Sequence, residues 1–155
     1  MTVADKLVEL LKARGLTCAT AESCTGGGVG SAITAVPGSS AVFAGGVISY
    51  ANEVKRDVLG VSARDLQTVG AVSPEVAAQM AAGARKLLGT DLAVSLTGVA
   101  GPDGGSAEKP VGLVWFGLAT KDGVRTEKVI FGGDRARVRE QAVTHALGML
   151  TIAAM

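Results

Sequence analysis

The stretch from Leu16 to Val36 constrains the fold more than any other part of the sequence. An apolar run over residues 16–21 predicts a short buried strand, and three consecutive glycines, Gly26–Gly28, follow a hydroxyl-rich segment. Small and apolar residues from Val29 onward then predict a helix. A strand that turns through glycines into a helix presents backbone N–H groups to an anion at the helix N-terminus. The pattern predicts an α/β fold, with a bound ligand beside the alcohol of Ser23.

The remaining chain predicts further helices and strands in alternation. Ser73, Pro74 and Glu75 combine a cap, a proline at the first helical position and an early acid, and Asn52 is expected to cap a shorter helix. Helices are expected over residues 2–14, 29–36, 53–59, 62–68, 74–88 and 135–153, and strands over 16–21, 43–50, 92–97, 111–120 and 124–131. This order predicts a single domain over residues 1–155, built as a three-layer α/β/α sandwich around a mixed, mostly parallel sheet.

Composition limits the classes of partner. Hydrophobic residues make up 48% of the 155 residues, yet no apolar run approaches the roughly 18 residues that a membrane span needs. The apolar surplus predicts a tight core and a subunit interface, hence a homo-oligomer, a dimer or larger. A net charge of +1 and an aromatic content of 3% argue against a nucleic-acid surface. The two cysteines have no zinc spacing, and without a secretory signal the chain is expected to be cytoplasmic.

Three polar clusters follow three of the predicted strands. They span residues 23–28, 50–55 and 97–105. Ligands in α/β folds gather beyond the carboxyl ends of parallel strands, so the three clusters are expected to form one pocket. No carboxylate pair in them has metal-ligand spacing, and we predict neither a metal nor a cofactor.

Ser23 is the candidate nucleophile of this pocket, and it needs a base. His145 is expected in the last helix, away from the pocket, so a Ser-His-Asp triad is not favoured. Lys55 can take a proton if it is desolvated, and Tyr50 ends the neighbouring strand. The sequence leaves both open as the base. Cys24 is a rival nucleophile, although small buried cysteines are common.

Two further sets of residues offer polar groups suited to binding a nucleotide. Thr97 and Gly98 offer a hydroxyl and backbone N–H groups to an oxyanion or a ribose. At 100° per residue, Arg135 and Arg139 share one side of the last helix, while Arg137 faces the opposite way. Guanidinium groups match a phosphate bidentately. An internal ion pair with Asp134 or Glu140 is the alternative.

Together these segments resemble a known family. The matching motifs are Thr20–Gly27, Ser49–Lys55, Leu59–Val61, Gly70–Ser73, Thr97–Gly105, Lys109–Gly112, Gly133–Arg135 and Val138–Arg139. In this order and spacing they resemble the C-terminal domain of the CinA competence/damage-inducible proteins, whose stand-alone members are nicotinamide mononucleotide deamidases. The resemblance does not extend to the N-terminal nucleotide-processing domain of larger relatives, so no property of that domain is expected here.

The resemblance implies an amidase of pyridine nucleotide recycling, which hydrolyses the carboxamide of nicotinamide mononucleotide to nicotinate mononucleotide and ammonia. It implies that Ser23 either attacks the amide carbon itself or activates a water molecule that does so. Lys55, Tyr50 and Thr97 would be the other catalytic residues. The expected substrate-binding residues are Thr25, Gly26, Gly27, Gly46, Asn52, Gly98, Gly101, Arg135 and Arg139. The alternative is a non-catalytic nucleotide- or partner-binding module linked to competence or the DNA-damage response.

Overall fold

The computed structural model describes residues 1–155 as alternating helices and strands. The helices are α1 (Val3–Arg14), α2 (Gly28–Thr34), α3 (Asn52–Leu59), α4 (Ala63–Thr68), α5 (Pro74–Leu88) and α6 (Arg135–Ala154), with a 3-10 turn at Ser39–Ala41. The strands are β1 (Cys18–Glu22), β2 (Phe43–Ile48), β3 (Leu92–Gly98), β4 (Leu113–Thr120) and β5 (Gly123–Ile130). Every expected element is present, with bounds shifted by one or a few residues.

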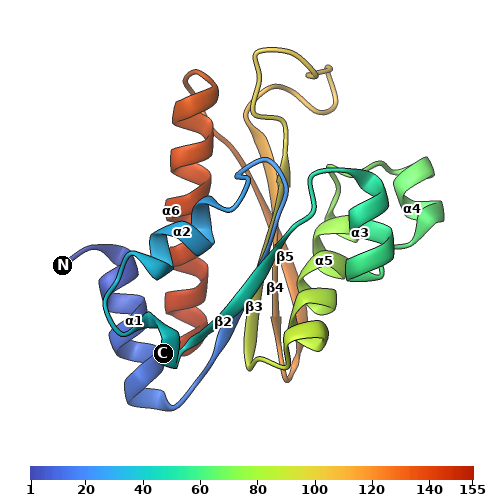
Figure 1. Cartoon of the computed structure of the whole chain (residues 1–155). Helices are drawn as coiled ribbons and strands as arrows, with labels where there is room; N and C mark the ends of the chain where they lie inside the picture. Colours follow the sequence, from blue (N-terminus) through green and yellow to red (C-terminus); the bar gives the residue numbers. More distant parts are fainter.

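The five strands form one sheet in the order β2-β1-β3-β4-β5. Strand β1 is parallel to β2 and β3, whereas β4 is antiparallel to β3 and β5, so only β4 runs against the other four. Helices α1, α2 and α6 cover one face, and α3 and α5 cover the other (Figure 1). The three-layer α/β/α fold with a mixed sheet is therefore confirmed.

The two faces of the sheet have differently built cores. Under α1 and α6 the core contains large side chains such as Leu7, Leu11 and Leu150. Under α5 it is mostly alanine. Helix α5 lies close on the sheet because β4 has a glycine there: a Cβ at Gly117 would meet the Ala77 carbonyl oxygen at 2.4 Å. Small residues thus let α5 pack tightly behind the central strands.

Local signals explain most of the helix ends. The Ser73 hydroxyl accepts from the Val76 N–H at 3.3 Å, and α5 begins at Pro74, as expected. The predicted cap of α3 is wrong. Ala51 occupies the cap position without a side-chain hydrogen bond, and Asn52 is already the first helical residue. The chain enters this helix one residue early, which frees the Asn52 side chain for the carboxyl edge of the sheet.

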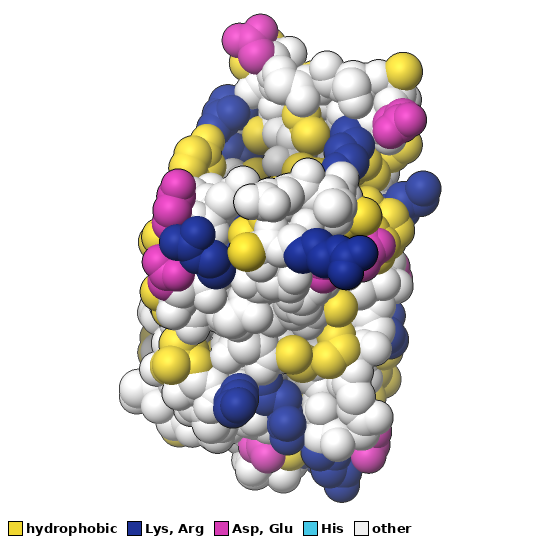
Figure 2. Space-filling view, turned by 90° about the vertical axis from the view of Figure 1, so that its right-hand side faces the viewer, with side chains coloured by type: hydrophobic (Ala, Val, Ile, Leu, Met, Phe, Trp, Pro, Cys, Tyr) yellow, Lys and Arg dark blue, Asp and Glu magenta, His cyan; other side chains and the backbone are white.

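The face that carries α3, α4 and α5 mixes basic and acidic side chains with scattered hydrophobic ones (Figure 2). It is hollowed near its top, below the long loop that joins β3 to β4 (Figures 1 and 2).

None of the helices combines the length and the hydropathy that crossing a bilayer requires. Self-association, which the apolar composition favours, stays a prediction.

Candidate active site

The segments that follow β1, β2 and β3 line one cavity at the carboxyl edge of the sheet. Its volume is about 200 Å³, and it is lined by Ser23, Cys24, Tyr50, Asn52, Lys55, Ala71, Val72, Thr97, Gly98, Ala100 and Arg135. A larger hollow of about 440 Å³ lies between the β4–β5 hairpin and the end of α6, but no buried polar side chain lines it. Buried polar side chains line the carboxyl-edge cavity, and this makes it the candidate active site.

A serine and a lysine meet inside this cavity. The Lys55 Nζ donates to the Ser23 Oγ at 2.9 Å and also contacts the carbonyl oxygens of Ser49 at 2.6 Å and Tyr50 at 3.2 Å. Lys55 is only 1% exposed and Ser23 8%. No carboxylate forms an ion pair with the ammonium. Burial therefore lowers the pKa of Lys55 below its ordinary value, which favours an amine able to take a proton.

Backbone hydrogen bonds bring these two residues together. The Ser23 N–H donates to the Leu96 carbonyl at 3.1 Å, which fixes the end of β1 against β3. The N–H and the hydroxyl of Ser49 both donate to the Glu22 carbonyl, at 2.7 and 3.2 Å, which fixes the end of β2 against β1. Helix α3 starts directly afterwards, so its second turn points Lys55 back at Ser23.

The N-terminus of α2 binds an anion that belongs to the chain itself. The carboxylate of Glu22 accepts from the Thr25 hydroxyl at 2.7 Å, the Val29 N–H at 2.9 Å and the Gly30 N–H at 3.0 Å. Glu22 is 2% exposed. The expectation that this helix terminus holds a ligand anion is therefore wrong, because a buried carboxylate already satisfies its N–H groups.

The loop that carries Ser23 uses most of its carbonyls but fewer of its N–H groups. The Ser23 carbonyl accepts from the Gly26 N–H at 3.1 Å, and the Thr25 carbonyl accepts from the Gly28 N–H at 3.0 Å. The N–H groups of Cys24 and Thr25 donate to no group of the protein. Desolvation raises the pKa of the Cys24 thiol to about 11, so the thiolate is disfavoured and the rival nucleophile is weak.

Thr97 and Tyr50 have different positions in the cavity. The Thr97 hydroxyl donates to the Ala71 carbonyl at 2.9 Å, so it holds the segment before α5 against the end of β3. Tyr50 is 64% exposed at the mouth, and it contacts Lys55 through its backbone carbonyl. Its phenol forms no hydrogen bond with Ser23, which makes Lys55 the group placed to act on that hydroxyl.

The three arginines of α6 separate into different environments. Arg135 lines the cavity and donates to the Gly101 carbonyl at 2.9 Å. Arg139 lies outside the cavity and donates to the carbonyls of Cys24 at 3.0 Å and Thr25 at 3.2 Å. Arg137 pairs with Glu140 at 3.6 Å on the outer side.

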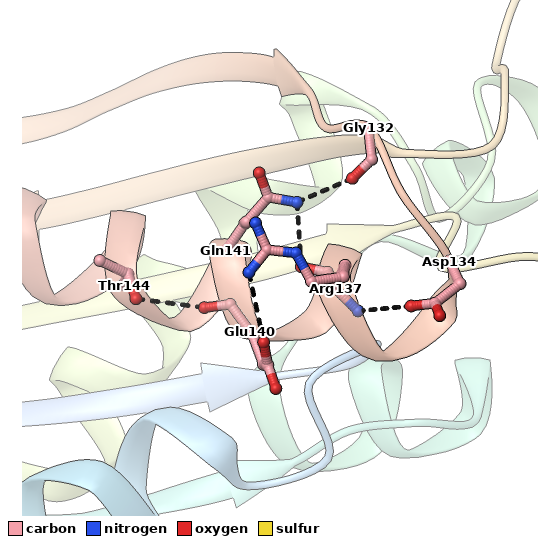
Figure 3. A network of polar contacts seen from close by, with 6 residues as sticks. All are labelled: Gly132, Asp134, Arg137, Glu140, Gln141 and Thr144. Carbon is pink, nitrogen blue, oxygen red and sulfur yellow. Dashed lines mark hydrogen bonds and ion pairs between the residues drawn. The ribbon is translucent and has the colours of Figure 1, made fainter.

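Figure 3 shows how the outer side of α6 is held. Asp134 accepts from the Arg137 N–H at 3.0 Å, and Gln141 donates to the carbonyls of Gly132 and Arg137. Neither Asp134 nor Glu140 pairs with Arg135 or Arg139, so the expected alternative of an internal ion pair is wrong for those two arginines.

Known proteins are similar to this chain over nearly its whole length. Residues 1–153 match the model of the CinA C-terminal domain. The chain belongs to this family. It is 50% identical over 151 residues to the nicotinamide-nucleotide amidohydrolase PncC of Escherichia coli strain K12, and the match covers 97% of this chain and 92% of that protein. The crystal structure of the competence/damage inducible protein CihA from Agrobacterium tumefaciens has a TM-score of 0.94 at 45% identity, covering 98% of this chain and 93% of that one.

Other members of the CinA family are longer. A putative competence-damage inducible protein of Halothermothrix orenii is 57% identical over 136 residues, which is 87% of this chain but 33% of that relative. One from Caldanaerobacter subterraneus is 51% identical over 144 residues, or 35% of its length. The chain thus spans about a third of these curated relatives.

Several predicted binding residues of this CinA domain lie outside the cavity. Gly46 is inside β2, where a Cβ would come within 2.1 Å of the Thr20 hydroxyl oxygen, so strand packing requires this glycine. Gly26 and Gly27 have positive φ angles of 58° and 99° and shape the turn into α2. The other residues outside the lining are Thr25, Gly101 and Arg139.

No histidine, aspartate or glutamate lines the cavity of this CinA domain, and His145 lies apart from it. The His145 Nε2 is 2.9 Å from a Glu127 carboxylate oxygen, under the β5 side of α6. No three His, Cys, Asp or Glu side chains form a group that could hold a metal ion. Sequence reasoning missed Glu22, whose signal was a single carboxylate at the end of an apolar strand directly before a glycine turn. It also missed Ala71, Val72 and Ala100, which lack any chemical signal.

Proposed function

We propose that this chain hydrolyses the carboxamide of nicotinamide mononucleotide to nicotinate mononucleotide and ammonia. The observation that carries the proposal is the 2.9 Å contact between the Lys55 amine and the Ser23 hydroxyl in a cavity with no histidine or carboxylate partner. The 50% identity to the nicotinamide-nucleotide amidohydrolase PncC of Escherichia coli, over nearly the whole of both chains, supports the substrate.

In the first step the Ser23 Oγ attacks the amide carbon, and its proton moves to the Lys55 Nζ. The lowered pKa of Lys55 favours the unprotonated amine that this step requires. The amide oxygen takes up negative charge. The Cys24 N–H follows the nucleophile directly and has no acceptor in the protein, so it is the group available to stabilise that charge.

In the second step the carbon–nitrogen bond breaks. The Lys55 ammonium returns its proton to the leaving nitrogen, ammonia departs, and an ester remains on Ser23. Water then attacks the ester carbon while Lys55 accepts a proton from it, and the Ser23 alkoxide leaves and is reprotonated. Every proton passes through one amine, which is also close to the carbonyls of Ser49 and Tyr50 when it is charged.

The other site residues have supporting roles in this proposal. Arg135, at the cavity wall, is the cation available to the substrate phosphate. Thr97 fixes the wall formed by Ala71, and Asn52 and Tyr50 flank the mouth. Because the helix α2 terminus holds Glu22, the phosphate is expected at Arg135 instead of at the glycine turn.

The test is an ammonia assay on purified protein with nicotinamide mononucleotide. Stoichiometric release of ammonia and nicotinate mononucleotide supports the amidase, and binding without turnover contradicts it. A burst of one ammonia per active site before the steady state indicates the Ser23 ester. A linear time course together with failure to trap an ester favours water that Ser23 orients.

A further inference from the structure

We propose that Arg139 is a positioning residue that holds the nucleophile loop, and that it does not bind the substrate phosphate. The proposal rests on the amidase function proposed above. Arg139 comes from α6, more than a hundred residues after Ser23, yet its guanidinium donates to two successive carbonyls of the loop, Cys24 at 3.0 Å and Thr25 at 3.2 Å. It has no carboxylate partner and does not line the cavity.

The Cys24 carbonyl decides where one free N–H group of the loop, that of Thr25, points. The Cys24–Thr25 peptide is trans, so its carbonyl and its N–H point in opposite directions. Holding the Cys24 carbonyl toward α6 therefore directs the Thr25 N–H away from α6. A fork of two donors fixes two neighbouring peptides at once, which a single lysine donor does not do.

The charge of Arg139 adds to this geometry. A cation on the oxygen side of a peptide polarises that peptide and makes its N–H a stronger donor. In the segment Ser23–Thr25 every carbonyl accepts a hydrogen bond, and only the N–H groups of Cys24 and Thr25 are without an acceptor. Through the Cys24 carbonyl, Arg139 thus orients and polarises the peptide directly after the Cys24 N–H that is available to the oxyanion, and it does so from outside the cavity.

Glu22 holds the same loop from the other end. Its carboxylate accepts from the Thr25 hydroxyl and from the first N–H groups of α2. Thr25 is consequently fixed through its side chain by an anion and through its carbonyl by a cation. Neither charged group lines the cavity. This arrangement assigns Arg139 to the loop, and it leaves Arg135 as the arginine at the cavity wall.

The first test compares Arg139→Met with Arg135→Met on two substrates, nicotinamide mononucleotide and its dephosphorylated nucleoside. Arg139→Met is expected to lower kcat for both substrates by the same factor, roughly 10- to 100-fold, with KM unchanged within about twofold, since a loosened loop holds Ser23 and the Cys24 N–H less precisely. Arg135→Met is expected to raise KM for the nucleotide alone. A rise in KM for the nucleotide alone in Arg139→Met would overturn the proposal.

The second test does not depend on turnover. Amide hydrogen exchange at Ser23, Gly26 and Gly28, whose N–H groups hold the loop closed, is expected to be at least about tenfold faster in Arg139→Met, because exchange follows local opening. Arg137→Met removes the outward arginine of the same helix and is expected to leave exchange and kcat unchanged.

The kinetic and exchange experiments distinguish failure of the amidase function from failure of the positioning role of Arg139. Unchanged exchange in Arg139→Met overturns the positioning role whether or not the protein is an amidase. Absence of ammonia release by the unmodified protein overturns the amidase, while the exchange experiment still decides the role of Arg139. If Arg139→Met does not fold, Arg139→Lys, which keeps the charge and loses the fork, is expected to give an intermediate loss of kcat with equal effect on both substrates, and equality with wild type would contradict the proposal.

Discussion

The loops after β1 and β3 are both rich in glycine and lie at the same edge of the sheet, but they are built in opposite ways. The loop Ser23–Gly27 is mostly buried, and an internal carboxylate and an internal arginine hold it. The loop 99–112 is closed at its base by hydrogen bonds between Val99, Leu113 and Gly112, and residues 102–108 are exposed. Glycine content alone therefore does not distinguish a turn that the fold holds in place from a loop that extends into solvent.

The difference lies in what accepts and donates within each loop. In the first loop, Arg139 of α6 binds two backbone carbonyls, and Glu22 of β1 binds the Thr25 hydroxyl. In the second loop, Arg135 of α6 binds only the Gly101 carbonyl, before the exposed part begins. Within the exposed part, Ser106 and Lys109 bond to each other, with the Ser106 N–H donating to the Lys109 carbonyl at 2.9 Å and the Lys109 N–H donating to the Ser106 hydroxyl at 3.0 Å. Stable hydrogen bonds fix the geometry of the first loop. Exposure makes the second loop tolerant of substitutions.

The largest expected effect comes from the nucleophile. Ser23→Ala is expected to lower kcat for ammonia release by at least about 10³-fold, because the attacking atom is lost while binding groups stay in place. Ser31→Ala, an exposed serine on α2, is the matched control and is expected to keep wild-type kcat. Steady-state ammonia assays measure both variants, and full activity of Ser23→Ala would break the assignment of the first loop as the catalytic one.

A comparable effect is expected at the amine. Lys55→Arg puts a guanidinium, which stays protonated, in place of the base, so kcat is expected to fall by at least about 10³-fold. In the unmodified protein kcat/KM is expected to rise with pH through the lowered pKa of Lys55, which lies below 10.5. A pH profile of kcat/KM measures this rise, and an identical ascending limb in Lys55→Arg would contradict the role of Lys55.

The same amine predicts how folding depends on pH. Its folded pKa is lower than its unfolded value, so between the two values the unfolded chain binds more protons and stability rises with pH, by at most about 1.4 kcal/mol per pH unit. Below the folded pKa the stabilisation is absent. Urea denaturation across this window should show the rise in the unmodified protein, and Lys55→Met should lack that contribution.

A smaller effect is expected where Glu22 meets the first loop. Thr25→Val keeps the shape of the side chain and removes the donor to the buried carboxylate, which is expected to cost about 1.5–3 kcal/mol of unfolding free energy. Thr25→Ser keeps the hydroxyl and is expected to retain most of that stability. Chemical denaturation compares the pair, and wild-type stability of Thr25→Val together with a loss in Thr25→Ser would show that the methyl group, and not the hydrogen bond, matters.

The smallest effect is expected in the second loop. Asp103→Ala combined with Glu108→Ala removes two exposed carboxylates from the loop after β3. Stability is expected to change by less than about 0.5 kcal/mol, and kcat by less than twofold, because neither side chain has a hydrogen-bond partner in the fold. A loss of kcat as large as that of an Arg139 variant would mean that this loop is as closely involved in catalysis as the first.

Sequence reasoning predicted the layers and the start of α5 from local spacing, and the meeting of Ser23 with Lys55 from the rule that ligand sites form where parallel strands end at one edge of a sheet. Hydrophobic runs fix strands, Ser73 and Pro74 fix a helix start, and a lysine soon after a strand end points back at that end. It did not predict the roles of Glu22 and Arg139. The Glu22 contacts depend on the left-handed backbone of Gly26 and Gly27, and the sequence alone does not tell whether a guanidinium binds a phosphate or a pair of carbonyls.

The account depends most on the protonation of one buried amine. Titration of the Lys55 side chain by NMR, through its ε-carbon in the folded protein, measures that quantity without substrate or turnover. The account predicts a pKa below the ordinary lysine value of 10.5, because the ammonium is buried and no carboxylate pairs with it. A pKa at or above 10.5 would contradict Lys55 as the base that activates Ser23.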